Sequence, residues 1–306
     1  SIVINNNSLY TNIPTITLTF TYQDETSGLG TISYGTSPTL YIISTPKATS
    51  TYTLDSTNGT RTIYYLIEDI VGWQSTFTDT IILDTVVPQA TFTINNQATY
   101  TFTKDVWLTE FEYTDPDPAS GIDQIRFRNE ADTLWTGWQE PCYLPIDWRL
   151  KDIEGPGTVC LQIKDKAGNL ATYTDSIIYD TTGPIGTMTI YGKGQTSRDY
   201  DTSTYAISTD VILGLSFSLD VGSISFSNNL VSWSAWQNPV ATCTWNLASG
   251  LIDAPVDGTR TVWLRTRDNA EATALFSDSI ILDRAIPTGS IVINNNSLYT
   301  NIPTIT

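Results

Sequence analysis

Hydrophobic and polar residues alternate with a period of two over most of the chain. Near the N-terminus, Ile16, Leu18 and Phe20 fall on one face of an extended segment, and Ile63 and Tyr65 fall on one face of a later segment. This period is typical of β-strands that bury one side. Asn- and Gly-rich turns separate the runs. The pattern predicts about seven strands before residue 85 and no helix.

The same succession of strands recurs twice. A short motif closes each copy: Asp, Thr or Ser, Ile, Ile, Leu or Tyr, Asp, and then Pro after three further residues. It occupies residues 79–88, 175–184 and 278–287, at spacings of 96 and 103 residues. The repeat predicts three modules, with boundaries at 1–85, 86–181 and 182–284. Because the linkers are short and contain Pro, we expect the modules to form a semi-rigid rod or filament.

A second, exact repeat overlies the diverged one. The first seventeen residues, SIVINNNSLYTNIPTIT, return unchanged at Ser290–Thr306. The chain is therefore one full period of 289 residues followed by the start of the next, so that residues 285–306 begin another repeat. We expect a tandem array in a longer natural polypeptide. A single subunit whose neighbours overlap or exchange this segment is the alternative.

Composition excludes several classes of function. The net charge is −17 and the isoelectric point about 4.1, so nucleic acid and anionic membranes would be repelled. No apolar run approaches the roughly 20 residues that span a bilayer, which argues against membrane insertion of this segment. There is no His, so triad chemistry and His-ligated metal catalysis are unavailable. We expect a protein that is not an enzyme.

Several motifs resemble the Ig-like repeats of large bacterial and archaeal surface proteins. They are the 164–169 hairpin turn (KDKAGN), the Ser120-Gly121-Ile122 turn, the 126–129 strand with its Trp pair, and the 226–229 strand with the second Trp pair. The likeness is strong in the middle module and looser in the other two. It implies an all-β fold of tandem Ig-like β-sandwiches on the cell surface, in an extracellular fibre or adhesin stalk.

Acidic residues gather in the loops that should meet where one module follows another. In an Ig-type sandwich, the loop after the second strand and the loop in the last hairpin lie at the pole that receives the preceding linker. The predicted clusters are Asp84 with Asp115, Asp117 and Asp165; Asp180 with Asp220 and Asp268; and Asp283 with the next repeat's counterparts of Asp24, Glu25 and Asp69. Ca²⁺ takes about six to eight oxygen ligands in flexible geometry, so these clusters are candidate calcium sites. Alternatively, each Asp caps its own turn without a metal.

Two Trp pairs are candidates for binding sugars. Trp135 and Trp138 lie three residues apart, as do Trp233 and Trp236. Exposed aromatic rings could stack on surface glycans. Spacing by three does not place both rings of a pair on one strand face, however, which favours a core position for one of them. Glycosylation sequons place candidate acceptors at Asn6, Asn58 and Asn295.

Three cysteines are too few for a disulfide scaffold. Cys160 alternates with hydrophobic residues on its strand, so we expect its side chain to face outward. A Cys142–Cys160 bridge is one interpretation, and three unpaired cysteines are the other.

The sequence thus predicts a structural rod that associates with itself, in tandem and laterally through open sheet edges. A glycan-binding adhesin repeat is the alternative.

Overall fold

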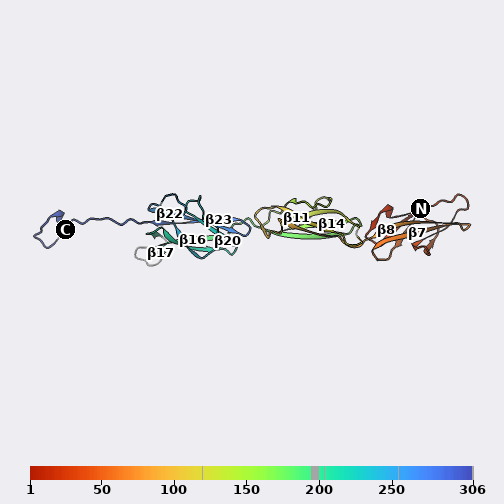
Figure 1. Ribbon diagram of the computed structural model, residues 1–306, viewed down its shortest axis with the longest axis horizontal. Helices are drawn as coiled ribbons and strands as arrows, with labels where there is room; N and C mark the ends of the chain where they lie inside the picture. Colours follow the sequence, from red (N-terminus) through yellow and green to blue (C-terminus); the bar gives the residue numbers. More distant parts are fainter. Residues whose placement is uncertain (119, 194–199, 203, 254, 305–306) are drawn as a thin grey trace. The chain divides into compact units, whose positions relative to one another are not determined.

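The computed structural model describes residues 1–118, 120–193, 200–202, 204–253 and 255–304. Within these residues the only helical elements are two 3₁₀ turns, η1 (Asn5–Asn7) and η2 (Asn294–Asn296). The rest of the regular structure is β-strand, as Figure 1 shows. The expected all-β fold of tandem sandwiches is confirmed. The chain divides into two compact units, Ser1–Asp180 and Thr181–Thr306.

The first unit begins with a sandwich of two sheets. One sheet has the order β1 (Ile2–Ile4), β3 (Thr15–Phe20), β6 (Thr49–Thr53). The other has the order β2 (Tyr10–Thr11), β8 (Gln74–Leu83), β7 (Gly59–Asp69), β4 (Leu29–Ser37), β5 (Leu40–Ser44). Neighbouring strands are antiparallel except β2, which runs parallel to β8.

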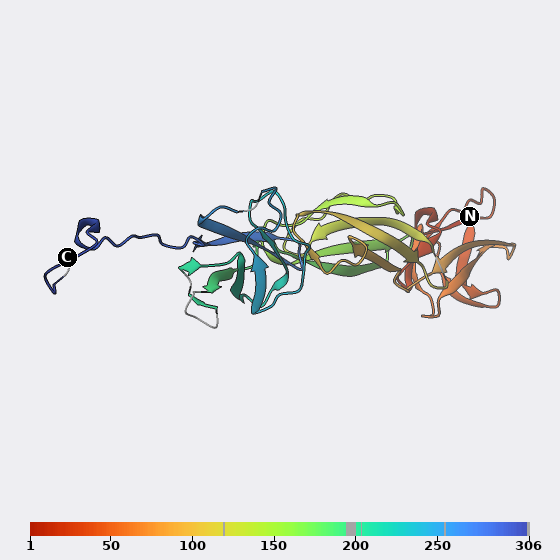
Figure 2. The ribbon, with the colours of Figure 1, turned by 60° about the vertical axis from the view of Figure 1, so that its left-hand side comes forward.

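A second sandwich with the same plan completes this unit, and its two layers are seen in Figure 2. Its smaller sheet has the order β13 (Ile146–Arg149), β11 (Asp105–Thr114), β9 (Gln89–Ile94). Its larger sheet has the order β10 (Tyr100–Thr101), β15 (Leu170–Tyr179), β14 (Gly155–Asp165), β12 (Ile122–Asn129).

The second unit contains a third sandwich. One sheet has the order β17 (Tyr200–Thr202), β16 (Gly186–Lys193), β19 (Asp210–Phe217), β21 (Thr242–Asn246). The other has the order β18 (Tyr205–Ala206), β23 (Thr273–Leu282), β22 (Gly258–Asp268), β20 (Val221–Ser227). After β23 the described chain contains no further strand.

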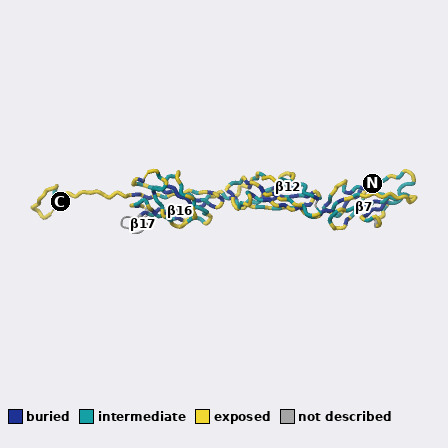
Figure 3. The backbone as a smooth tube through the Cα atoms, viewed as in Figure 1, coloured by how far each residue is buried: buried dark blue, intermediate teal, exposed yellow. Residues whose placement is uncertain are grey.

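Each sandwich encloses its own hydrophobic cluster, built from the alternating residues of both sheets. The three clusters lie within residues 2–83, 90–179 and 188–282. In the first, the rings of Phe20 and Tyr65 stack with their centroids 4.7 Å apart. Figure 3 shows the buried positions alternating along the strands. Among the described residues, each sandwich therefore has a hydrophobic core formed by its own strands.

The first two strands of the first and second sandwiches belong to different sheets. In the first, β1 pairs with β3, and after η1 the chain crosses so that β2 pairs with β8. Asn5, Asn6 and Asn7 make this crossing with φ of 42°, 54° and 65°, values that Asn tolerates better than most residues. Residues 95–97 repeat the crossing in the second sandwich. Asn5 Oδ1 accepts a hydrogen bond from the Thr17 N–H at 2.8 Å, which fixes the turn to β3.

The repeated Asp-Thr/Ser-Ile-Ile motif has a structural cause. The first Asp of each copy lies on the last strand, and its carboxylate accepts a hydrogen bond from an N–H of the first strand. Asp79 accepts from Ile4 at 2.8 Å, Asp175 from Ile94 at 2.7 Å, and Asp278 from Ile190 at 2.8 Å. The motif therefore fastens the first strand across the sandwich.

The cysteines are free, so the Cys142–Cys160 bridge is not formed. Cys160 points away from the core that Val159 and Leu161 enter, as expected, but only 4% of the residue is exposed. Arg128 on β12 and Thr174 on β15 lie directly across from it in the sheet. Burial raises the pKa of the Cys160 thiol.

Candidate metal centre at the junction of the first two sandwiches

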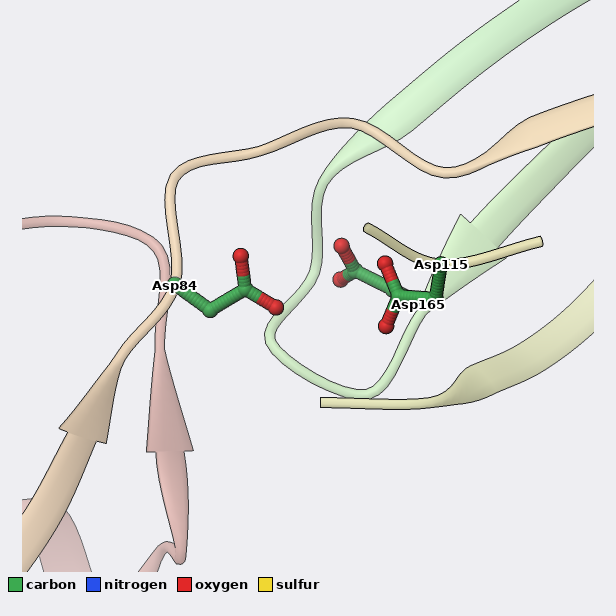
Figure 4. A group of neighbouring side chains, drawn as sticks. All are labelled: Asp84, Asp115 and Asp165. Carbon is green, nitrogen blue, oxygen red and sulfur yellow. The ribbon is translucent and has the colours of Figure 1, made fainter. Parts of the chain in front are cut away.

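Three aspartates from three elements converge where the first sandwich meets the second. Asp84 directly follows β8, Asp115 directly follows β11, and Asp165 ends β14. One carboxylate oxygen from each lies within 4.8 Å of the other two. Figure 4 shows the Asp84 carboxylate directed toward Asp115 and Asp165. Asp84 and Asp165 are buried, and Asp115 is half-buried.

Asp84 is bonded to both sandwiches. Its N–H donates to the Thr11 carbonyl of the first sandwich at 2.9 Å. Its Oδ2 accepts from the Ser120 N–H of the second sandwich at 3.0 Å, and its carbonyl accepts from Asn169 Nδ2 at 2.9 Å. Its Oδ1 accepts from the Val86 N–H, which shapes the linker. These bonds hold the linker against the second sandwich.

Asp165 organises the turn between β14 and β15. Its Oδ1 accepts from the N–H groups of Gly168 and Asn169 at 2.7 and 2.8 Å, and its Oδ2 accepts from Asn169 Nδ2 at 2.7 Å. Gly168 has φ of 98°, a left-handed conformation that Gly adopts without strain. The turn thus presents the Asn169 side chain to Asp84.

Asp115 has one unused oxygen. Its Oδ2 accepts from the Gly121 N–H, whereas its Oδ1 is buried and has no hydrogen-bond partner among the described residues. Burial raises the pKa of Asp115, and the charges of Asp84 and Asp165 raise it further. None of the three forms an ion pair with any described Lys or Arg. The cluster therefore favours a compensating cation or proton.

The ligand atoms that these residues offer are of the type that Ca²⁺ binds. The centre offers three carboxylates, and carboxylate oxygens are among the donors that Ca²⁺ prefers. The Asp115 carboxylate lies near two further carboxylates and has one oxygen without a hydrogen-bond partner, so an ion there would neutralise negative charge in a largely buried space. Asp117, also expected here, is exposed and is not one of the three converging residues.

The other two predicted clusters do not form a comparable group within the part of the chain that the structure describes. Asp180 belongs to the first unit, whereas Asp220, which is exposed, and Asp268, which is buried, belong to the second. Asp268 Oδ1 accepts from the N–H groups of Ala270 and Ala272. It therefore caps its turn, as the metal-free alternative expects.

In the first sandwich, two of the predicted acidic residues are joined by a serine. Ser27 Oγ donates to Asp24 Oδ2 at 3.0 Å and to Asp69 Oδ2 at 2.9 Å. Glu25 is exposed and accepts from Gln23. Asp283 is exposed, and its Oδ1 accepts from the Ala285 N–H. The prediction joins Asp283 to the next repeat's counterparts of Asp24, Glu25 and Asp69, which are not among the 306 residues of this chain.

The Trp pairs lie outside the cores and stack on cations. The Arg126 guanidinium lies 5.1 Å from the ring centroid of Trp135 and 4.2 Å from that of Trp138. Arg265 lies between Trp233 and Trp236 in the same way, at 4.5 and 4.3 Å. All four rings are half-buried. The expectation that one ring of each pair enters the core is wrong.

A different pair of Trp residues packs against the cores. Trp148 contacts the second cluster and donates from Nε1 to Asn129 Oδ1 at 2.8 Å. Trp245 contacts the third cluster and donates to Asn228 Oδ1 at 2.9 Å. The sequence pattern could have predicted their packing against the cores, because each of these Trp residues alternates with polar neighbours on a short strand.

The residue after the first Trp of each pair protects a sheet edge. Thr136 exchanges hydrogen bonds with the Phe127 backbone on β12, and Ser234 does the same with Phe226 on β20. Further along, Gln139 pairs with Ile125 and Gln237 pairs with Ile224. These edges are thus covered, which disfavours the sheet-edge association that we expected there.

The candidate glycosylation sites differ in exposure. Asn6 and Asn295 are exposed, whereas Asn58 is half-buried and its Oδ1 accepts from the N–H and Oγ1 of Thr85. Glycosylation at these positions stays a prediction.

No protein-family model matches the chain, and no curated protein matches it significantly. Solved structures similar to it are Ig- and fibronectin-III-like modules and tandem repeats of large adhesins. Fibronectin(III)-like modules of Clostridium thermocellum CbhA share 12% identity over 59% of this chain and 94% of theirs, with a TM-score of 0.38. A Ca²⁺-stabilized adhesin with which an Antarctic bacterium binds ice shares 14% identity over 91% of this chain and 72% of its own, with a TM-score of 0.42.

A third similar structure comes from a 1.5-MDa bacterial ice-binding adhesin. It shares 12% identity over 92% of this chain and 98% of its own, with a TM-score of 0.43. Likenesses at this level do not indicate what the present chain binds. Among the described residues, no helix has the length and apolar character needed to cross a membrane.

Replacing Asn169 by Ala should loosen the junction. The buried Asp84 carbonyl and Asp165 Oδ2 would each lose a donor, so we expect a loss of about 1–3 kcal/mol in the free energy of unfolding of the first unit. Trp73 holds the matching position in the β7–β8 turn but is 80% exposed, so Trp73→Ala should change stability by less than about 0.5 kcal/mol. Calorimetry of both variants tests this. Equal effects would contradict a role for Asn169 in the junction.

Replacing Arg126 by Lys should weaken the outer face of the second sandwich. Lys keeps the charge but loses the planar stacking between two Trp rings and the two-point bond to Gln162 Oε1. We expect urea unfolding to show a loss of about 1–2 kcal/mol. The matched control is Arg149→Lys, whose exposed ion pair with Asp105 should be worth less than about 1 kcal/mol. A larger loss in the control would refute the stacking argument.

Proposed function

We propose that this chain is a mechanical segment of an extracellular surface fibre or stalk. In this proposal it consists of three sandwich modules, 1–85, 86–181 and 182–284, repeated with a period of 289 residues. The observation that carries the proposal is the bonding of Asp84 to both sandwiches. A spacer needs joints that resist bending, and a linker that is buried and hydrogen-bonded on both sides provides one.

The separate cores support the same function. Each sandwich buries its own hydrophobic cluster, so local unfolding under load need not propagate along the fibre. An acidic surface with net charge −17 keeps long chains soluble and apart.

The proposal includes Ca²⁺ binding at the junction of the first and second sandwiches. Asp84, Asp115 and Asp165 would hold the ion, and the ion would supply the positive charge that the cluster lacks. An ion that binds only the folded junction stabilises it by about 2.7 kcal/mol when its concentration is 100 times Kd. Ca²⁺ sites of extracellular modules commonly have Kd near 10⁻⁴–10⁻³ M, which suits the proposed location.

Removal of calcium tests the metal. We expect Ca²⁺ to raise the melting temperature of the first unit and chelation to lower it, since ligand binding favours the folded junction. Asp115→Asn should abolish the response, whereas Asp117→Asn should keep it, because Asp117 is exposed and lies outside the cluster. Calorimetry with and without chelator measures both. If the wild-type chain does not respond to Ca²⁺, or if the two variants behave alike, the metal proposal fails.

The spacer proposal is tested separately by passing the chain over immobilised polysaccharides. We expect no retention, because one face of each outer Trp ring is occupied by Arg. Retention that disappears in a folded Trp135→Ala/Trp233→Ala variant would instead favour the glycan-binding adhesin repeat.

A further inference from the structure

The strand β5 leaves one edge of the first sandwich open. It is the last strand of its five-stranded sheet and pairs on one side only, with β4. In the second and third sandwiches, the segment with the Trp pair holds this position beside β12 and β20, where it makes isolated bridges at Gln139 and Gln237. Modules in tandem meet at the loops that end their strands, as they do at Asp84, so a neighbouring module does not cover a strand at the side of a sheet.

The edge at β5 lacks the features that usually protect an edge strand, which are Lys, Pro within the strand or a very short strand. The edge strands β1 and β2 have three and two residues, whereas β5 has five. The exposed residues of the remaining edge strand, β6, are all Thr. In β5, by contrast, Ile42 is 51% and Ile43 is 74% exposed. Because alternate residues of an edge strand direct their N–H and C=O groups away from the sheet, β5 offers unpaired backbone groups beside apolar side chains.

The sheet around this edge carries little charge. No charged residue occurs between positions 26 and 46. Ser33 on β4 lies across from Ile43 on one side and from Leu66 on the other. The residue of the second sandwich that corresponds to Ser33 is Arg126, which stacks on the Trp pair. Since each chain has a net charge of −17, two copies repel each other least where neither presents a charge.

The sequence around β5 is suited to pairing with a second copy of itself. Two identical antiparallel strands are related by a two-fold axis, so residues at equal distances from one central residue lie opposite each other. Pro38 and Pro46 flank β5, and both are four residues from Ile42. Because Pro has no N–H to donate, these two residues limit the run that can form a ladder. The run from 39 to 45 is therefore centred on Ile42.

We propose that β5 of one chain pairs antiparallel with β5 of a second copy of the chain, with Ile42 opposite Ile42. The five-stranded sheet then continues from one chain into the other. In this register Thr39 lies opposite Thr45, and the Ile43 residues of the two copies are diagonal neighbours on one face of the joined sheet. The contact uses the same surface on both copies, so it closes as a pair. It goes beyond the spacer function and does not depend on the proposed metal.

The contact is small, so we expect it to be weak. A pair of five-residue strands covers much less than the roughly 1,200 Å² that stable specific interfaces bury. We therefore expect the chain to pair with a Kd between about 10⁻⁵ and 10⁻³ M. In the proposed fibre, β5 recurs once per 289-residue period, so that contacts between two fibres would add. This last step rests on the proposed function, whereas the pairing of two copies of the chain does not.

The experiment compares the wild-type chain with two matched variants. Ile43→Lys places a charge at the open edge, and Ile43 is exposed, so the variant should fold normally. The control is Ile153→Lys, which makes the same change at a residue of the second sandwich that is 69% exposed. Sedimentation equilibrium up to about 1 mM protein measures mass, since this range reaches the weak end of specific binding. Amide hydrogen exchange at low and high concentration locates the contact, and calorimetry checks folding.

We expect the mass of the wild-type chain to rise with concentration from 33.8 kDa toward twice that value. Exchange at residues 39–45 should slow at high concentration, because pairing protects their N–H groups. Ile43→Lys should weaken the association at least about tenfold, and Ile153→Lys should behave as the wild-type chain does. The proposal is overturned if the wild-type chain stays monomeric up to 1 mM, if both variants weaken association equally, or if association leaves exchange at residues 39–45 unchanged. None of these results bears on the resistance of the junction to bending, so the spacer function is tested independently.

Discussion

The start of each sandwich must satisfy two sheets at once, and much of the structure follows from this constraint. An N-terminal strand that paired with only one sheet would leave backbone groups of the other without partners. The left-handed Asn turn at residues 5–7 transfers the chain between sheets, and the Asp79 carboxylate fastens the end of β1. The Thr11 carbonyl, at the end of this crossing, then accepts the Asp84 N–H at the start of the linker.

The hydrogen bond between Asp84 and Thr11 links the first strands of one sandwich to the linker that leads into the next. Asp84 is fixed on one side by Thr11 and on the other by Ser120 and Asn169. Its carboxylate is thereby held near Asp115 and Asp165, an arrangement that would be unfavourable without compensating charge. The hydrogen bonds that fix the linker therefore also bring three carboxylates together.

Stacked Arg and Trp side chains cover part of the outer faces of the second and third sandwiches. The guanidinium groups of Arg126 and Arg265 each stack against two indole rings there. Residues 136–139 and 234–237 pair with the edge strands and block further strands from joining there. The first sandwich has β5 at that edge in place of the Trp segment. Stability and protection against lateral aggregation thus come from one short segment.

The sequence by itself determined the strands, the threefold repeat and the Asp84, Asp115 and Asp165 cluster. It could do so because alternation with period two is local, and because an Ig-type sandwich always brings the same loops to one pole. Only the tertiary structure decided that the Trp pairs stack on Arg, that Cys160 is buried and that Asp117 stays outside the cluster. These outcomes depend on which side chains lie across from one another on neighbouring strands. Strand register is set by packing and turns far apart in the chain, and no local pattern encodes it.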